Sequence, residues 1–197
     1  MNLTEESLRD LIDGRMVGNK YPYDTMDEKE ITAHMKRLFY RMNRIPDLVC
    51  EAEWDHFGSG YASFVEFFCY RKQDVTILNE KNGMKEIEIK GIIVDVCRLA
   101  PAAIMGEDVR TRKLRVKTNE EVSGAYGSLI DRSGEFHVSR KFEVTARQLE
   151  RALREFDYEL LKPEQLYQSL PFSTKIPTIY RKPEEYIVLD ALFYWED

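Results

Sequence analysis

Cysteine is scarce in this sequence, and its placement excludes a disulfide framework or a zinc ribbon. The chain has 3 cysteines in 197 residues. Cys50, Cys69 and Cys97 lie in strand-like runs, with no Cys-X-X-Cys pair and no histidine at ligand spacing. An odd number of separated cysteines is typical of a reducing compartment. We therefore expect three buried, reduced thiols in a cytoplasmic protein.

The sequence also lacks long apolar runs and linker-like segments. No apolar run approaches the ~20 residues that a membrane-spanning helix needs. The acidic start, Met1-Asn-Leu-Thr-Glu-Glu, does not have the build of a signal peptide. Because no Pro/Gly/Ser-rich segment divides the chain, we expect one globular domain over residues 1–197.

Motifs of the common enzyme classes are absent too. The sequence contains no phosphate-binding loop, no Gly-X-Ser-X-Gly, no His-Glu-X-X-His and no dinucleotide-binding fingerprint. We therefore expect no cofactor. The 29 basic and 35 acidic side chains give a net charge of −6. Such a surface repels nucleic acid and favours a basic protein partner.

Helical and strand-like patterns occupy separate parts of the chain, which predicts an α+β fold. Capping-box pairs at Thr25/Glu28 and Thr145/Gln148 mark the starts of two helices with apolar stripes. Between them, residues 48–97 read as a series of strands. We expect a mostly antiparallel sheet of about six to eight strands, flanked by N-terminal and C-terminal helices that cover one face. Residues 185–195 form either a last strand, which their composition favours, or a buried helix.

The most specific pattern lies between Asp74 and Lys90. Lys81-Asn82-Gly83 predicts a three-residue turn, which pairs Ile77 with Ile87. Asp74 then lies across from Lys90 and diagonal to Glu88. After Gly91 the apolar positions change from odd to even numbers, as a β-bulge would produce.

The arrangement of Asp74, Glu88 and Lys90 resembles the Asp, then Glu-X-Lys pattern of the restriction-endonuclease-like nuclease superfamily. The resemblance implies a divalent metal ion on Asp74 and Glu88 that orients a water, with Lys90 nearby, for phosphodiester hydrolysis. It is confined to this hairpin. The chain also departs from the family pattern, because strand-forming residues continue after Lys90 where the family enters a helix. The alternative interpretation is a solvated hairpin face with an ion pair between Asp74 and Lys90.

Acidic and aromatic side chains indicate a surface for protein binding. Acidic residues alternate along the strand-like run from Leu48, so they share one face. Such a row also discourages strand pairing, which is the simpler interpretation. Tyrosine and tryptophan are enriched at interfaces. The basic run 110–117 is expected to be the solvated face of a strand. The predicted binding residues are Glu51, Glu53, Trp54, Asp55, Tyr21, Tyr23 and Trp195.

These observations favour a non-catalytic cytoplasmic protein that binds a basic protein partner, by analogy with antitoxin and immunity proteins as a class. The metal-dependent nuclease or phosphodiesterase is the alternative. Ligand binding in a sheet-lined cup is a third interpretation that the sequence leaves open.

Overall fold

A computed structural model describes residues 3–58, 60–131, 136–178 and 180–196. The helices within these ranges are α1 (Glu5–Ile12), α2 (Glu28–Met42), α3 (Glu143–Glu155), α4 (Pro163–Leu166) and α5 (Val188–Leu192). The strands are β1 (Leu48–Glu53), β2 (Tyr61–Ala62), β3 (Phe64–Arg71), β4 (Val75–Lys81), β5 (Met84–Cys97), β6 (Ala102–Arg115), β7 (Glu121–Ala125), β8 (Glu159–Leu160) and β9 (Trp195–Glu196).

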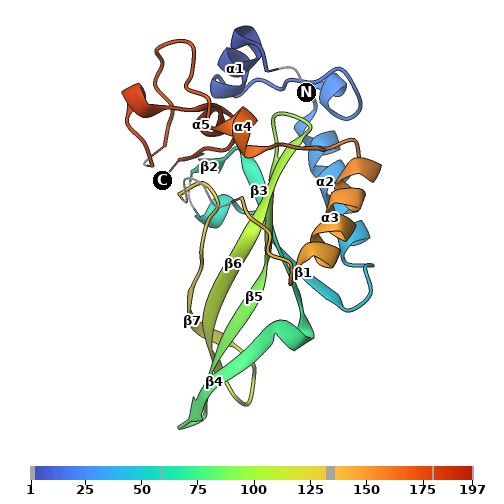
Figure 1. Cartoon of the computed structure of the whole chain (residues 1–197), viewed down its shortest axis with the longest axis vertical. Helices are drawn as coiled ribbons and strands as arrows, with labels where there is room; N and C mark the ends of the chain where they lie inside the picture. Colours follow the sequence, from blue (N-terminus) through green and yellow to red (C-terminus); the bar gives the residue numbers. More distant parts are fainter. Residues whose placement is uncertain (1–2, 59, 132–135, 179, 197) are drawn as a thin grey trace.

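The main sheet has 7 strands and is almost entirely antiparallel, which confirms the predicted α+β class. Its order is β1-β3-β5-β6-β7, with β4 added to the first half of β5 and the short β8 parallel to β6. The lower halves of β5 and β6 run with β4 and β7 into a narrow arm, away from the helices (Figure 1). A separate pair, β2 and β9, joins the C-terminal segment to the residues just before β3.

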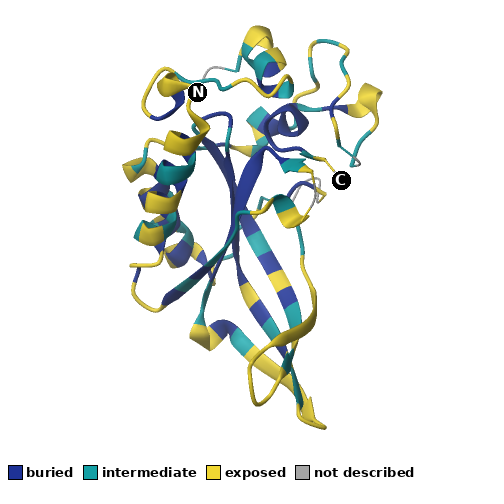
Figure 2. Ribbon diagram, turned by 180° about the vertical axis from the view of Figure 1, so that it is seen from behind, coloured by how far each residue is buried: buried dark blue, intermediate teal, exposed yellow. Residues whose placement is uncertain are grey.

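Apolar cores lie on both faces of the sheet. The stripe that the sequence predicted on α2 packs on one face together with α3. On the other face α1 and α5 pack against Phe64, Phe68 and Ile93. The prediction of helices on one face was therefore wrong. Helices cover both faces because the upper residues of β3 and β5 are mostly apolar and buried on both sides of the sheet (Figure 2). The three cysteines are free and buried, as predicted.

Two helix starts differ from the predicted capping boxes. The N-cap of α2 is Asp27, whose carboxylate accepts from the Lys29 amide at 2.8 Å, rather than Thr25. Helix α3 begins at Glu143, before Thr145. The Thr145 and Gln148 side chains instead accept from Arg71 on the neighbouring strand, at 3.0 and 3.1 Å.

The C-terminal run is a buried helix followed by a short strand. Residues 188–192 form α5, and only Trp195–Glu196 pairs as a strand. The helix is buried on all sides, so its β-branched and apolar content reflects burial and not sheet formation. No helix of the described residues is long and apolar enough to cross a membrane.

The predicted hairpin forms with a different turn. Asn82 and Gly83 both have positive φ, 54° and 72°, and make a two-residue turn that pairs Lys81 with Met84. A register shift between Ile77 and Asn79 then restores the predicted pairing of Ile77 with Ile87. The period-two argument gave the correct apolar pairing but could not show that a bulge, and not a longer turn, supplies the extra residue.

No bulge occurs at Gly91. The pairing of β5 with β6 continues without a shift from Met84↔Arg115 to Val96↔Ala103. The even-numbered apolar residues after Gly91 face the core under α2 and α3, while Ile93 stays on the same face as Ile89. Gly91 is needed for close packing, because a Cβ there would lie 2.7 Å from the Cys69 carbonyl oxygen.

Candidate functional site

The structure does not assemble the nuclease-like triad. Asp74 lies in a 3₁₀ turn before β4, is buried, and its carboxylate is 2.7 Å from the Lys141 ammonium. Lys90 pairs with Glu88 at 3.2 Å and faces Val109 of β6 across the ladder. The predicted Asp74–Lys90 pairing was wrong because the chain turns before the strand begins. Among the described residues no group of three or more His, Cys, Asp or Glu side chains is arranged to hold a metal ion.

A pocket of ≈ 590 Å³ lies instead on the sheet face that carries Glu51 and Glu53. We call it the acidic pocket, because its described lining includes five carboxylates and two guanidinium groups. Its volume lies within the usual range of ligand sites. Its lining residues include Glu51, Glu53, Phe57, Phe64, Glu66, Phe68, Arg110, Arg112, Glu121, Tyr126, Ser128, Asp131, Tyr180 and Trp195.

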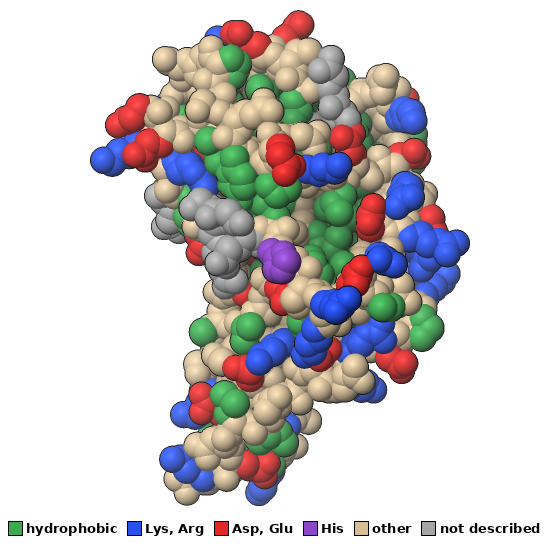
Figure 3. Space-filling view, in the orientation of Figure 1, with side chains coloured by type: hydrophobic (Ala, Val, Ile, Leu, Met, Phe, Trp, Pro, Cys, Tyr) green, Lys and Arg blue, Asp and Glu red, His purple; other side chains and the backbone are tan. Residues whose placement is uncertain are grey.

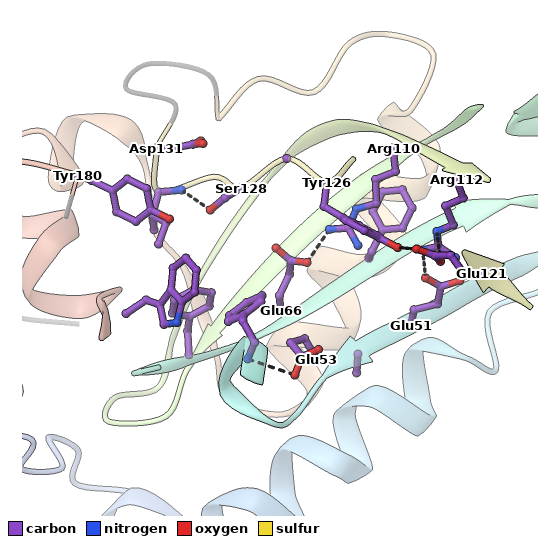
Figure 4. A pocket seen from close by; sticks show the side chains of 17 residues that line it. Glu51, Glu53, Glu66, Arg110, Arg112, Glu121, Tyr126, Ser128, Asp131 and Tyr180 are labelled. Atoms are coloured by element: carbon purple, nitrogen blue, oxygen red, sulfur yellow. Dashed lines mark hydrogen bonds and ion pairs between the residues drawn. The ribbon is translucent and has the colours of Figure 1, made fainter. Parts of the chain in front are cut away.

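Strand register brings these side chains together. Directly opposed residues in an antiparallel sheet point to the same face. Glu53 opposes Glu66 across β1 and β3, and Glu66 opposes Asp95 across β3 and β5. The result is a row of three carboxylate-bearing positions across adjacent strands. Figure 4 shows Glu66 in the middle of the pocket, with Glu51, Arg112 and Glu121 at one end and Tyr180 and Asp131 at the other.

Arg110 holds two of the buried carboxylates. Its guanidinium donates to Glu66 at 2.5 Å and to Asp108 at 3.0 Å, and its side chain is 6% exposed. It lies over the Phe68 ring at 3.9 Å. Burial raises the pKa of Glu66 above its ordinary value, although the charge of Arg110 opposes the shift.

Arg112 makes a second ion pair nearer the rim. It donates to both oxygens of Glu51, one of them at 2.9 Å, and lies 3.6 Å from Glu121. Burial works against ionisation of Glu51, but the hydrogen bonds and charge of Arg112 outweigh it and lower the pKa of Glu51. The Tyr126 hydroxyl donates to Glu121, and burial followed by this contact raises the pKa of Tyr126 to about 12. The rim is thus held in one arrangement by charged contacts.

Asp95 lies on the same face as Glu51 and Glu66 but, unlike them, makes no ion pair with an arginine of the described chain. It is 0% exposed, and neither of its carboxylate oxygens has a hydrogen-bond partner among the residues that the structure describes. Burial raises the pKa of Asp95 well above its ordinary value, and the nearby charge of Glu66 adds to the shift. Buried polar groups are normally satisfied, so an unpartnered carboxylate indicates either a proton or an external cation.

Aromatic rings form the other end of the acidic pocket. The Phe57 ring lies 5.4 Å from the Trp195 ring and 5.5 Å from the Phe64 ring. Glu53 fixes the turn that carries Phe57, since its carboxylate accepts from the Asp55 amide at 2.7 Å. Tyr180 also lines this end of the pocket (Figure 4), and burial raises its pKa, with the charges of Asp131, Asp95 and Glu66 adding to the shift.

Three of the seven predicted binding residues line this pocket: Glu51, Glu53 and Trp195. The pocket lining does not include Asp55, which is exposed beside it. Trp54 packs on the opposite face, against Phe39 of α2 and Phe67. Tyr21 is exposed and donates to Glu30 at 2.7 Å. Tyr23, expected near a surface, is buried and donates to the Cys97 carbonyl oxygen at 2.7 Å.

Sequence reasoning missed the centre of the pocket. Glu66 is the one charge between Phe64 and Tyr70, and Asp95 is likewise the one charge within Ile92–Cys97, which is the signal that could have marked both. The basic run was expected to be solvated, but Arg110 is buried and Arg112 is 14% exposed. Alternation along β6 gave their shared face correctly. It could not show that β1 supplies acidic partners for that face.

Comparison of the chain with models of known protein families, with curated protein sequences and with solved structures found no significant match.

Proposed function

We propose that this chain is a non-catalytic binding protein that recognises a basic protein partner through the acidic pocket, as antitoxin and immunity proteins recognise theirs. The observation that carries the proposal is the combination of five carboxylates with aromatic rings in one pocket. Aromatic rings supply contact area at low entropic cost, and carboxylates select positive charge.

The placement of charge supports the acidic pocket as the binding surface. Acidic and basic side chains are interspersed over the body and the arm in the view of Figure 3. Within the acidic pocket the two guanidinium groups are both engaged with carboxylates of the chain itself. The excess of negative charge in its described lining is therefore available to a cationic partner.

A basic nine-residue peptide with four arginines is expected to bind the wild-type protein, and the affinity should fall as salt is raised. The double variant Glu53→Gln, Asp131→Asn removes two charges from the pocket lining and should weaken binding about tenfold or more. Fluorescence anisotropy of the labelled peptide at two salt concentrations measures both effects.

The matched control is Glu143→Gln, Glu150→Gln on α3, whose exposed carboxylates pair with Arg147 and Arg154 on the far side of the sheet. It removes the same charge and should change the affinity less than about twofold. Equal losses in the two double variants would show that only net charge matters and would contradict the proposal, as would the absence of peptide binding to the wild type.

A further inference from the structure

We infer that the acidic pocket receives one guanidinium group, the side chain of an arginine on the partner, at the position of Glu66 and Asp95. The inference rests on the proposed function and specifies the chemical group that the pocket takes. It concerns the row of carboxylates across β3 and β5, and not the rim.

The chain's own arginines show how this sheet face holds guanidinium groups. Arg110 combines a carboxylate, Glu66 at 2.5 Å, with an aromatic face, Phe68 at 3.9 Å. Arg112 combines Glu51 with the Tyr126 ring at 5.6 Å. A planar guanidinium suits such sites, because it donates in a fork and stacks on rings.

A third set of carboxylates and aromatic rings lies beside the two that hold Arg110 and Arg112. Asp95 supplies a fully buried carboxylate without a partner among the described residues, next to Glu66 and on the face where Phe64 also lies. The Phe57 ring contacts the Phe64 ring, and the Trp195 ring contacts Phe57. The basic residues of the described pocket lining are Arg110 and Arg112, and each already belongs to another set. In this third set Glu66 already accepts from Arg110, whereas Asp95 has no hydrogen-bond or ion-pair partner among the described residues.

A guanidinium group in the pocket contacts Glu66 directly. Asp95, on the adjacent strand, acts on the bound cation through its charge. Glu66 lines the pocket, whereas Asp95 is not among the described lining residues and opposes Glu66 on the adjacent strand. Directly opposed residues are about 5 Å apart, so a cation held by Glu66 also compensates the charge of Asp95. Glu66 opposes Asp95 across the ladder, and the nearby charges of Arg110 and Asp108 on β6 also act on the pKa of Asp95, while Asp95 acts on that of Tyr180.

The chemistry of the set selects a guanidinium over other cations. A divalent metal ion needs several oxygen ligands, and the described residues contain no such group of three. A lysine ammonium is strongly hydrated and does not stack as a plane, so it loses more on entering a ring-lined pocket. The arginine side chain combines the required positive charge with a flat surface.

The test uses three small probes: the N-acetyl amides of arginine, lysine and citrulline. Citrulline has the shape of arginine without its charge. Two-dimensional NMR titrations at low salt are expected to show saturable shifts at Tyr126 and Trp195 with the arginine probe, with at least about fivefold weaker binding of the lysine probe and none of the citrulline probe. These three titrations use the wild-type protein, so their outcome does not depend on whether a variant folds.

Asp95→Asn is expected to lower the affinity of the protein for the arginine probe about fivefold or more, while Glu150→Gln should leave this affinity unchanged. Any of three results would overturn the inference. The citrulline probe could bind with the affinity of the arginine probe, the lysine probe could do so, or Asp95→Asn could leave the affinity for the arginine probe unchanged. If the nine-residue peptide still binds through Glu53 and Asp131 while the arginine probe fails, the inference falls and the proposed function stands. If neither binds, both fall.

Discussion

Replacing Arg110 by methionine is expected to lower the free energy of unfolding by about 3 to 5 kcal/mol at pH 7, the largest effect that we predict. The substitution keeps an unbranched apolar side chain and removes the guanidinium group, which lies over Phe68 and compensates the charges of Glu66 and Asp108. Both carboxylates are buried, with side chains 8% and 0% exposed. Removing one partner of a buried ion pair leaves the other desolvated and uncompensated. Urea unfolding followed by circular dichroism measures the difference.

Arg151→Met is the matched control for this prediction. Arg151 is 78% exposed and pairs with Glu155 at 3.2 Å on the surface of α3. Its replacement should change the free energy of unfolding by less than about 0.5 kcal/mol. Adding Glu66→Gln to Arg110→Met should recover about 1 to 3 kcal/mol, because the buried charge is then removed as well. A loss below about 1 kcal/mol in Arg110→Met would contradict the description of this network as a buried ionic core.

Asp95→Asn should act in the opposite direction and raise the free energy of unfolding by about 1 to 3 kcal/mol at pH 7. The carboxylate oxygens are fully buried and have no hydrogen-bond partner in the described ranges, so ionising the carboxyl group in the folded protein is unfavourable. The pKa of Asp95 is raised in the folded protein, chiefly by burial. Folding therefore becomes less favourable as the pH rises from the unfolded pKa, ~3.9, towards the folded one.

The stability difference between Asp95→Asn and the wild type should therefore depend on pH. Below about pH 4 the Asp95 carboxyl is protonated in both states, so wild type and variant should have nearly equal stability. The advantage of the variant should grow as the pH rises. Thermal unfolding at several pH values between 4 and 7 measures it, with the exposed Asp55→Asn as the control. A variant that is less stable at pH 7, or a difference that does not vary with pH, would show that Asp95 is satisfied in the folded protein.

The two predicted effects of Asp95→Asn oppose each other. The variant should be more stable and should bind the arginine probe less tightly. A residue that only supported the fold would lower both stability and binding when replaced, and an inert one would change neither. Functional sites commonly retain groups that are unfavourable for folding, and Asp95 has that property.

The sequence predicted the framework of the fold well, because hydrophobic periodicity is local. The stripe on α2, the strands around Leu48 and Tyr70, and the pairing of Ile77 with Ile87 all follow from spacing within one segment. Local chemistry was less decisive where a tertiary contact competed. Thr145 and Gln148 have the pattern of a helix start, yet they bind Arg71.

The candidate site could be predicted only in part. Alternation along β1 placed Glu51 and Glu53 on one face, as the structure has them. The centre of the pocket depends on which strands are neighbours: Glu66, Asp95 and Arg110 come from β3, β5 and β6 and are far apart in the chain. Strand order is set by tertiary packing, so no spacing in the sequence joins these three residues. A single charge within an apolar strand is the signal that marks Glu66 and Asp95 beforehand, but Arg110 lies within a basic run and carries no such signal.

The most direct test of the central claim is the titration of the Asp95 carboxyl carbon by ¹³C NMR, assigned with Asp95→Asn, in the free protein and with the N-acetyl arginine amide. We predict a midpoint well above the ordinary ~3.9 in the free protein and a lower midpoint when the arginine probe is bound, since a cation next to Asp95 favours its charged form. A midpoint near the ordinary value, or one that the arginine probe does not move, would contradict the claim that this buried carboxylate helps to receive a cation.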